Sequence, residues 1–218
     1  MIDRIIVAID VTEISDFSIL FERTKEIFKW YKIHSIFLKG NREVINVLKE
    51  HDKKIFLDLK FFDIPATVEK HIKVISELAD MFTVHLLSGS ECLKRVTKVS
   101  QDLGIIPVGV SILTSFSDQD LNEIGINYSV EEEIAKLVEL GMNNGISHFV
   151  CSPIEVPLIK KKFPEAKLIT PGIRITNDVD DQKRVTSPKE AFSSGADFII
   201  MGRDLFRLDN PKMIENYL

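Results

Sequence analysis

Three charged residues lie close together after an apolar run: Asp58, Lys60 and Asp63 follow residues 55–57. Alternate residues of a β-strand point to the same side, so Asp58 and Lys60 are expected to project together. Asp63 comes where the strand turns into its loop. Acids beside a lysine keep the ammonium charged until a substrate takes its proton. The spacing predicts a proton-transfer site, although the same pattern is also typical of a solvated ion pair of little energetic value.

Two segments with glycine and arginine near the end of the chain form a second candidate site. Pro171, Gly172 and Arg174 follow one apolar run, and Gly202 and Arg203 follow another. Glycine lets backbone N–H groups approach a phosphate closely, and arginine can bind it through two parallel hydrogen bonds. These segments therefore predict a phosphate site. The alternative is that the glycines only form turns.

An alternation of strand-like and helix-like segments must position both sets of residues. Apolar runs predict strands at residues 5–10, 35–39, 55–60, 81–86, 105–113, 147–151, 168–170 and 197–202. Helices are expected between them, at residues 14–30, 43–51, 65–79, 90–100, 130–144, 155–162, 188–194 and near the C-terminus. Strands that are apolar on both faces are typical of parallel sheets covered by helices.

Eight strand–helix pairs in 218 residues predict a (β/α)8 TIM barrel, with residues 1–218 as a single domain. A doubly wound open sheet is the alternative, but it usually has fewer strands and often carries a G-x-G-x-x-G loop, which this sequence lacks. Barrels of this type form their active sites at the C-terminal ends of the strands. Titratable residues stand at the predicted ends: Asp10, Lys39, Asp58, Lys60, His85 and Arg203.

Composition limits the classes of function. The formal net charge of −5 and the isoelectric point of about 5.6 argue against a nucleic-acid partner, but not against a small phosphorylated ligand. The sequence has no apolar run of the roughly 20 residues that cross a bilayer, and no signal peptide is recognised. Cys92 and Cys151 lie in apolar surroundings without a C-x-x-C motif, so we expect reduced, buried thiols in a cytoplasmic protein.

No metal site or cofactor is expected. The sequence lacks H-x-H, H-E-x-x-H and clustered Cys/His motifs. Asp10 and Asp58 could hold magnesium, but Lys39 and Lys60 compete for the same charge. For His85, a hydrogen-bonded structural role is favoured over a role as base or ligand.

The residues described above resemble the orotidine 5′-phosphate decarboxylase family, and the resemblance covers nearly the whole chain. Its most specific element is Asp58-x-Lys60-x-x-Asp63-Ile64-Pro65-x-Thr67. Further matching elements are Ala8-Ile9-Asp10, Lys39, Leu113-Thr114-Ser115-Phe116-Ser117, Pro171-Gly172-Ile173-Arg174 and Gly202-Arg203. The compact length looks like the archaeal branch of this family.

The resemblance implies decarboxylation of orotidine 5′-monophosphate to UMP without a cofactor, as the last step of de novo UMP synthesis. It implies that Lys60 donates a proton to C6 of the pyrimidine and that Asp58 lies against the departing carboxylate. It also implies a homodimer in which Asp63 and Thr67 reach the neighbouring subunit's site.

The same resemblance assigns the substrate contacts. Asp10 and Lys39 would hold the ribose hydroxyls and support the charge network. The pyrimidine would meet Ser117 and Pro171, with Thr114 in the same region. The phosphate would be held by the last two loops, through Gln182, Gly202 and Arg203, with Gly172 and Arg174 beside them.

Two other functions fit parts of the pattern. The magnesium-dependent 3-keto-L-gulonate 6-phosphate decarboxylase and hexulose-6-phosphate synthase share D-x-K-x-x-D, but Ile64-Pro65 and Thr67 favour the orotidine enzyme. A nucleotide-binding barrel without catalytic activity would keep Gly202 and Arg203. Such a protein would have little use for alternating charges at the strand ends.

Overall fold

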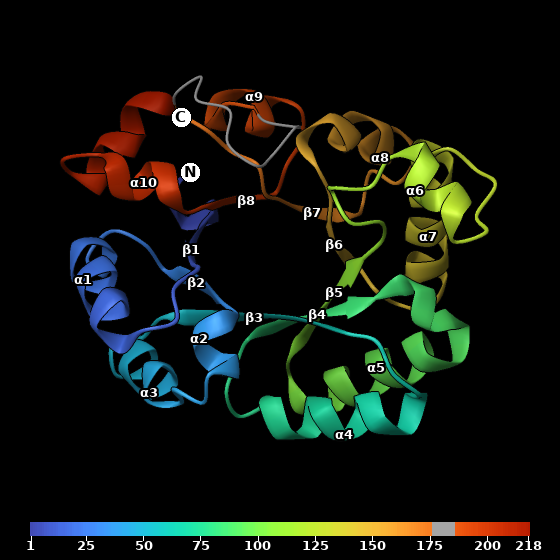
Figure 1. Ribbon diagram of the computed structural model, residues 1–218, viewed down its shortest axis with the longest axis horizontal. Helices are drawn as coiled ribbons and strands as arrows, with labels where there is room; N and C mark the ends of the chain where they lie inside the picture. The colour runs from blue at the N-terminus through green and yellow to red at the C-terminus, as the bar shows by residue number, and fades with distance from the viewer. Residues whose placement is uncertain (176–185) are drawn as a thin grey trace.

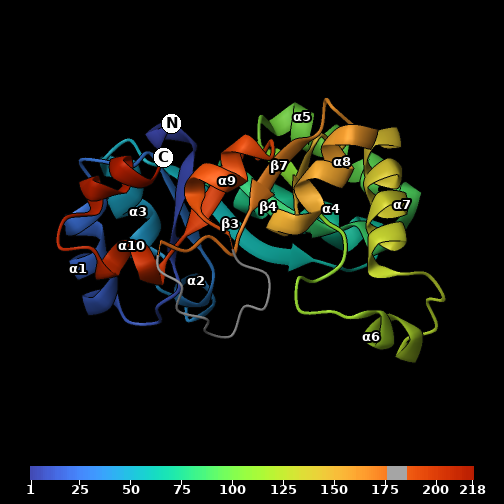
Figure 2. The ribbon, with the colours of Figure 1, turned by 90° about the horizontal axis from the view of Figure 1, so that it is seen from above.

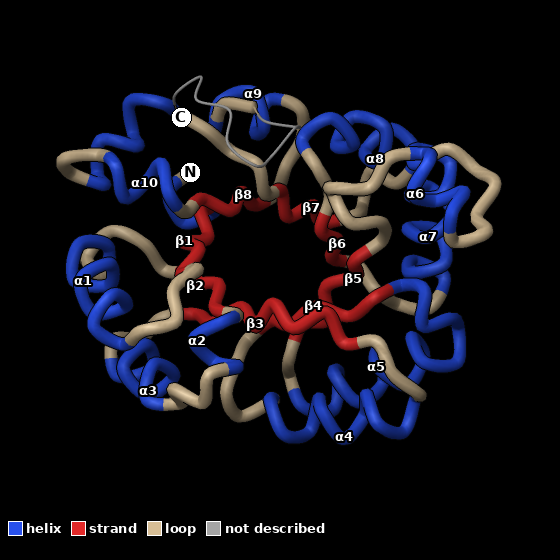
Figure 3. The backbone as a smooth tube through the Cα atoms, viewed as in Figure 1, coloured by secondary structure: helices blue, strands red, loops and turns tan. Residues whose placement is uncertain are grey.

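Eight parallel strands close into a barrel in the order of the sequence, with β1 paired to β8 (Figures 1 and 3). The structure is a computed structural model that describes residues 1–175 and 186–218. The strands are β1 (Ile5–Ile9), β2 (Trp30–Ile33), β3 (Lys54–Phe61), β4 (Met81–His85), β5 (Ile106–Val110), β6 (His148–Val150), β7 (Lys167–Thr170) and β8 (Phe198–Met201). The predicted single-domain TIM barrel is confirmed, and the doubly wound sheet is wrong.

Helices surround this ring of strands (Figure 3). They are α1 (Ile14–Thr24), α2 (Ser35–Leu38), α3 (Glu43–Glu50), α4 (Pro65–Ile75), α5 (Gly89–Leu103), α6 (Asp118–Glu123), α7 (Val130–Asn143), α8 (Val156–Lys162), α9 (Pro188–Ser193) and α10 (Arg203–Arg207). Short 3-10 turns are η1 (Ile2–Arg4), η2 (Leu86–Ser88), η3 (Pro153–Glu155) and η4 (Pro211–Tyr217). Helix α6 was not expected from the sequence, and it projects beyond the helical ring in Figure 2.

Capping residues explain where several helices begin. Ser117 and Ser129 each exchange hydrogen bonds with an acid three residues later, which closes a capping box at α6 and at α7. Ser187 does the same at α9. Pro65 begins α4, where its missing N–H leaves no hydrogen bond unmade. These signals fix the loops that follow the strands and so place the side chains at the strand ends.

The apolar side chains form two separate layers. The larger one lies between the strands and the helices, where the amphipathic helices bury their apolar faces. The smaller one fills the inside of the barrel with Ile6, Ala8, Phe56, Met81, Val108, Ile169 and Ile200. Layers of branched side chains inside a TIM barrel make a packed core and not a pore. This inner layer forms an apolar floor beneath the C-terminal ends of the strands.

The second strand differs from the sequence prediction. Residues 35–38 form helix α2, while the strand is Trp30–Ile33, which begins at the last residue of the expected first helix and continues through residues expected to connect that helix to the strand. In this register Lys32 pairs with Ala8 of β1 on one side and with Phe56 of β3 on the other. Both partners belong to the inner layer, so the side chain of Lys32 points into the barrel.

Strand β3 contains a bulge. Leu57 pairs with Phe82 and Phe61 pairs with Val84, so three residues of β3 lie opposite the single residue Thr83 of β4. A bulge leaves extra residues unpaired, bends the strand and redirects its side chains. Lys60, inside this bulge, has a φ of 48°, the left-handed region that residues with a Cβ rarely adopt.

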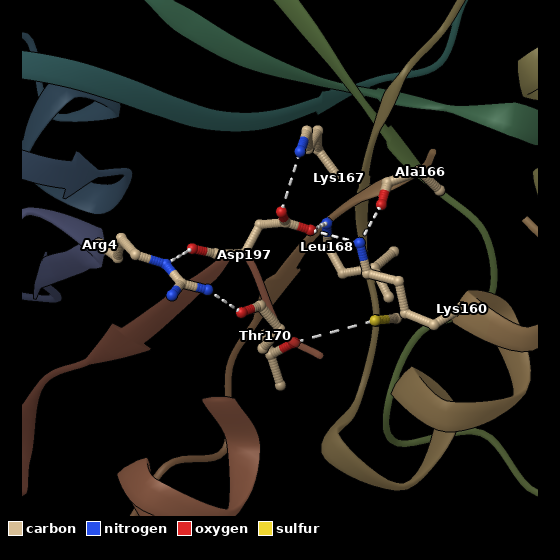
Figure 4. A network of polar contacts seen from close by, with 9 residues as sticks. Arg4, Lys160, Ala166, Lys167, Leu168, Thr170 and Asp197 are labelled. Atoms are coloured by element: carbon tan, nitrogen blue, oxygen red, sulfur yellow. Dashed lines mark hydrogen bonds and ion pairs between the residues drawn. The ribbon is translucent and has the colours of Figure 1, made fainter. Parts of the chain in front are cut away.

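A network of polar contacts joins the strands at the opposite, N-terminal end of the barrel (Figure 4). Asp197, just before β8, accepts hydrogen bonds from Nζ of Lys160 at 2.8 Å, from Nζ of Lys167 at 3.2 Å and from the backbone N–H of Leu168 at 2.9 Å. Arg4, just before β1, donates to the carbonyl of Asp197 at 2.7 Å. These contacts fasten β1, β7 and β8 together where the barrel closes.

Both cysteines are buried and neither forms a disulfide, as expected. Burial raises the pKa of the Cys92 and Cys151 thiols, which keeps them protonated. Within the described residues, no helix is both long and apolar enough to cross a membrane.

Candidate active site

The C-terminal ends of the strands surround a cavity of about 920 Å³. Its floor is the apolar inner layer, through Ala8, Phe56 and Ile200. The residues from the sequence analysis that line it are Asp10, Asp58, Lys60, Thr114, Pro171, Gly172, Arg174, Gly202 and Arg203. The cavity therefore brings Asp58 and Lys60 of β3 and the arginine segments that follow the last two strands to one site.

Four charged side chains of alternating sign lie along one side of this cavity. Nζ of Lys60 lies 2.8 Å from Oδ1 of Asp58. Nζ of Lys32 lies 3.5 Å from Oδ2 of Asp58 and 3.0 Å from Oδ1 of Asp10. The inner members are the less exposed ones, at 10% for Lys32 and 16% for Asp58, against 41% for Lys60 and 65% for Asp10. Both lysines line the cavity, and Lys60 is the more exposed of the two.

The sequence analysis missed Lys32 and expected Lys39 in its place. That expected location is wrong: Lys39 follows α2, forms an ion pair with Glu13 at the surface and does not line the cavity. The error follows from the misplaced second strand. A signal for Lys32 was present, because Trp30, Tyr31 and Ile33 are aromatic and β-branched residues that favour strands. A charged residue inside such a run is unusual and could have marked a buried lysine.

Two lysines hold Asp58 in its ionised form. Burial alone would raise the pKa of this carboxyl, but the charges of Lys32 and Lys60 and hydrogen bonds from Lys60 and Thr83 outweigh it, and the pKa is lowered. His85 at the end of β4 has a lowered pKa because of burial and of the nearby Lys60 charge. Its ring Nδ1 accepts a 3.4 Å hydrogen bond from the backbone N–H of Leu87, consistent with the structural role expected for it.

The arginine segments form the other side of the cavity. Arg174 is 9% exposed, and among residues 1–175 and 186–218 its Nε and one of its terminal nitrogens have no hydrogen-bond partner. Asp204 lies 3.9 Å from its Nε and orients it. Gly172 has a φ of 79°, which explains why glycine occupies the turn after β7. At Gly202 an added Cβ would lie 3.4 Å from Cβ of Ala8, an ordinary contact, so packing alone does not require glycine there.

Three other predicted residues lie away from this cavity. Asp63 is exposed on the loop after β3, where its carboxylate accepts from the backbone N–H of Ile64 at 2.7 Å. Thr67 lies on α4. Ser117 caps α6, and its hydroxyl donates to Asp120 at 2.5 Å. Gln182 falls outside the described residues.

The chain supplies its own cation between the two acids that could have held magnesium. The ammonium of Lys32 lies within 3.5 Å of both Asp10 and Asp58. Over residues 1–175 and 186–218, no group of three or more His, Cys, Asp or Glu side chains gathers as a metal centre. The arrangement is one of pre-placed ammonium groups, which can stabilise negative charge and donate protons.

Comparisons with known proteins agree over almost the whole chain. The Orotidine 5′-phosphate decarboxylase / HUMPS family matches residues 3–214. The orotidine 5′-phosphate decarboxylase of Prochlorococcus marinus strain AS9601 is 37% identical over 223 residues, covering 97% of this chain and 92% of the relative. That of strain MIT 9215 is 37% identical over 221 residues, covering 96% and 91%. The crystal structure of orotidine 5′-phosphate decarboxylase from Lactobacillus acidophilus superposes with a TM-score of 0.85 at 27% identity, covering 98% of this chain and 96% of that one.

Proposed function

The chain belongs to the orotidine 5′-phosphate decarboxylase / HUMPS family, and from that membership we propose that it converts orotidine 5′-monophosphate to UMP and CO₂ in pyrimidine biosynthesis. One observation carries this proposal beyond the family match: the ammonium of Lys60 stands at the cavity, 2.8 Å from Asp58, with a second buried ammonium behind it. The reaction needs no cofactor, because these side chains supply both the positive charge and the proton.

The reaction breaks the bond between C6 of the pyrimidine and its carboxylate carbon. The electron pair of that bond stays on C6, and CO₂ leaves. The ring delocalises this negative charge poorly, so a fixed cation in a site with an apolar floor contributes strongly to lowering the barrier. Lys60 then donates a proton to C6, which forms UMP and leaves a neutral amine that solvent protonates again.

Asp58 and Lys32 prepare Lys60 for this step. Asp58 stays ionised and pairs with the ammonium of Lys60 at 2.8 Å before the reaction. Lys32 balances Asp58 from behind, so the acid does not become an isolated buried charge when Lys60 gives up its proton. Asp10 forms the outer end of the row, where its exposed carboxylate can accept hydrogen bonds from ribose hydroxyls.

We assign the phosphate to the side of the cavity formed by Gly172, Arg174, Gly202 and Arg203. Two nitrogens of Arg174 that have no hydrogen-bond partner within the described part of the chain support this assignment, because buried polar groups are normally paired and a phosphate would complete them. Pro171 and Thr114 also line the cavity, and we assign the pyrimidine to them. Binding energy from the remote phosphate can then position the ring.

We further propose a cytoplasmic homodimer in which Asp63 and Thr67 complete the partner's site. Support comes from their surroundings: Asp63 lies between Phe62 and Ile64, which are 63% and 66% exposed. Exposed apolar side chains of this size commonly mark an interface. The compact archaeal form of the family stays a prediction from the sequence.

Mixed dimers test the shared site. Lys60→Ala and Asp63→Ala should each be inactive alone. In a mixed dimer one of the two sites carries both changes and the other carries neither, so random mixing should restore about a quarter of the wild-type activity. No recovery on mixing, with dimers present by light scattering, would contradict a shared site.

The activity itself is tested by following the absorbance of orotidine 5′-monophosphate with and without EDTA. We expect full turnover in both cases. Turnover that stops with EDTA would favour a magnesium-dependent sugar-phosphate activity of the kind considered above. Binding of UMP without any turnover would favour a nucleotide-binding barrel.

A further inference from the structure

The bulge of β3 gives Lys60 an unusual backbone. Among the described residues, only Asp52 and Lys60 combine a side chain with a positive φ, and Asp52 lies in a turn after α3, where this conformation is common. Lys60 adopts it within a strand, at the residue whose ammonium reaches the cavity. Such a conformation is unfavourable for a residue with a Cβ and persists only where the surroundings hold it.

One side chain opposite the bulge contacts both functional residues of β3. The hydroxyl oxygen of Thr83 accepts a 2.7 Å hydrogen bond from the backbone N–H of Lys60. The same hydroxyl donates its proton to Oδ1 of Asp58 at 3.1 Å. Thr83 is fully buried, and it is the single residue of β4 that faces Asp58, Leu59 and Lys60.

The chemistry of a hydroxyl suits this position. A hydroxyl has one proton to donate and lone pairs that accept, so it can serve an N–H and a carboxylate at the same time. The N–H of Lys60 has left the regular ladder and needs an acceptor, and the ionised Asp58 needs a donor. A valine of the same shape could do neither.

We propose that Thr83 is a positioning residue that holds the backbone of Lys60 in its left-handed conformation and orients Asp58 toward the ammonium. It acts through these two residues and lies outside the set that lines the cavity. The kinetic part of this inference depends on the proposed decarboxylase activity. The structural part, the conformation of Lys60, does not.

Thr83→Val is the principal test, with Thr83→Ser as the variant that keeps the hydroxyl. We expect Thr83→Val to lower kcat by about 10–100-fold, because small displacements of a reacting group produce losses of this size. The Kd for UMP should stay within twofold, since the phosphate contacts are untouched. Thr83→Ser should restore kcat to within about threefold of the wild type.

Thr24→Val is the matched control. Thr24 is also fully buried, and its hydroxyl also both donates and accepts: it donates to the carbonyls of Leu20 at 2.8 Å and Phe21 at 3.3 Å, and it accepts from Tyr31 at 3.1 Å. It lies on α1, away from the strand ends that carry the charges. The kcat of Thr24→Val should stay at the wild-type value even if the melting temperature of this variant falls.

Two kinetic results would overturn the proposal: Thr83→Val with kcat within twofold of the wild type, or Thr83→Ser as impaired as Thr83→Val. If Thr83→Val does not fold, Thr83→Ala removes the hydroxyl without adding bulk and is judged by the same criteria. A crystal structure of the variant gives the readout that does not depend on turnover. We expect Lys60 to leave the positive-φ region or its Nζ to move away from Asp58, and retention of both would refute the inference even if the wild type proved inactive.

Discussion

The barrel contains two similar clusters at its opposite ends, each with one aspartate between two lysines. At the C-terminal end Asp58 contacts Lys32 and Lys60. At the N-terminal end Asp197 contacts Lys160 and Lys167 (Figure 4). The pKa of both carboxyls is lowered in spite of their burial. The central aspartate and its two lysines are therefore alike at the two ends, and the difference lies in what surrounds them, including Asp10, which pairs with Lys32 at the C-terminal end.

Backbone groups form additional hydrogen bonds with the side chains of the N-terminal cluster. Asp197 accepts from the N–H of Leu168, and Lys160 also donates to the carbonyl of Ala166 at 2.6 Å. The C-terminal cluster instead has a bulged strand, a lysine with unfavourable φ, and a cavity in front of it. An ion pair therefore stabilises the fold where backbone groups form its remaining hydrogen bonds. It can react where one partner faces a cavity that admits a ligand.

Exchanging a lysine for alanine in each cluster should separate these roles most strongly. Lys60→Ala is expected to lower kcat by at least about 10⁴-fold, because it removes both the cation and the proton donor. Lys167→Ala, in the other cluster, should keep kcat within twofold. Steady-state assays measure both, and UMP titration should show that the Lys60 variant still binds phosphate-bearing ligands. Native turnover in the Lys60→Ala variant would contradict the role of Lys60 as the proton donor.

The second lysine tests the corrected assignment. Lys32→Ala is expected to lower kcat by about 10²–10³-fold, because Asp10 and Asp58 would face each other without their shared cation. Lys39→Ala removes only a surface ion pair with Glu13, so its kcat should stay within threefold. A larger loss of kcat in Lys39→Ala than in Lys32→Ala would show that Lys39, and not Lys32, belongs to the site.

The error at Lys39 shows what the sequence could and could not predict. The barrel followed from the alternation of strands and helices, and Asp58, Lys60 and Arg203 followed from their position at strand ends. The position of the second strand did not, since residues 30–33 and 35–38 are both short segments with three aromatic or aliphatic residues each. Only pairing with Ala8 and Phe56 distinguishes them.

The bulge was also beyond prediction from the sequence. No glycine marks the positive φ of Lys60, and Thr83 reads as an ordinary residue of a buried strand. Its contacts depend on a register between two strands more than twenty residues apart in the sequence. Pairing of that kind is set by tertiary structure and leaves no local pattern.

Asp197→Asn is the converse change and should affect stability. Loss of the charge weakens contacts with two lysines, so we expect the free energy of unfolding to fall by about 2 kcal/mol, with kcat within twofold. Urea denaturation measures the free energy of unfolding, and a steady-state assay measures kcat. The control is Asp102→Asn at an exposed position of α5, which should change stability by less than about 0.5 kcal/mol. A large loss of kcat in Asp197→Asn would mean that the two ends are coupled.

The smallest expected effect is the pH dependence of the difference in unfolding free energy between the wild type and Asp197→Asn. Burial would raise the pKa of Asp197, but hydrogen bonds from Lys160, Leu168 and Lys167 lower it. A carboxyl with a lowered pKa stabilises the fold above its unfolded value of about 3.9, and this contribution is lost as the pH falls through the folded value. Wild type and Asp197→Asn should therefore differ by a constant amount from pH 7 to about 5 and converge below about 4. A difference that grows on acidification would contradict this assignment.

The bulge of β3 also limits how far the thermal stability of this barrel can be raised. Between the paired positions β3 has three residues where β4 has one. Deleting two of them would restore an uninterrupted ladder, remove the left-handed residue and raise the melting temperature, while drawing the ammonium away from the cavity. Selection for heat resistance alone would favour that deletion, whereas selection for turnover would oppose it, a conflict often found at active sites. Thermostabilised variants should therefore gain their stability elsewhere and keep this segment at its present length.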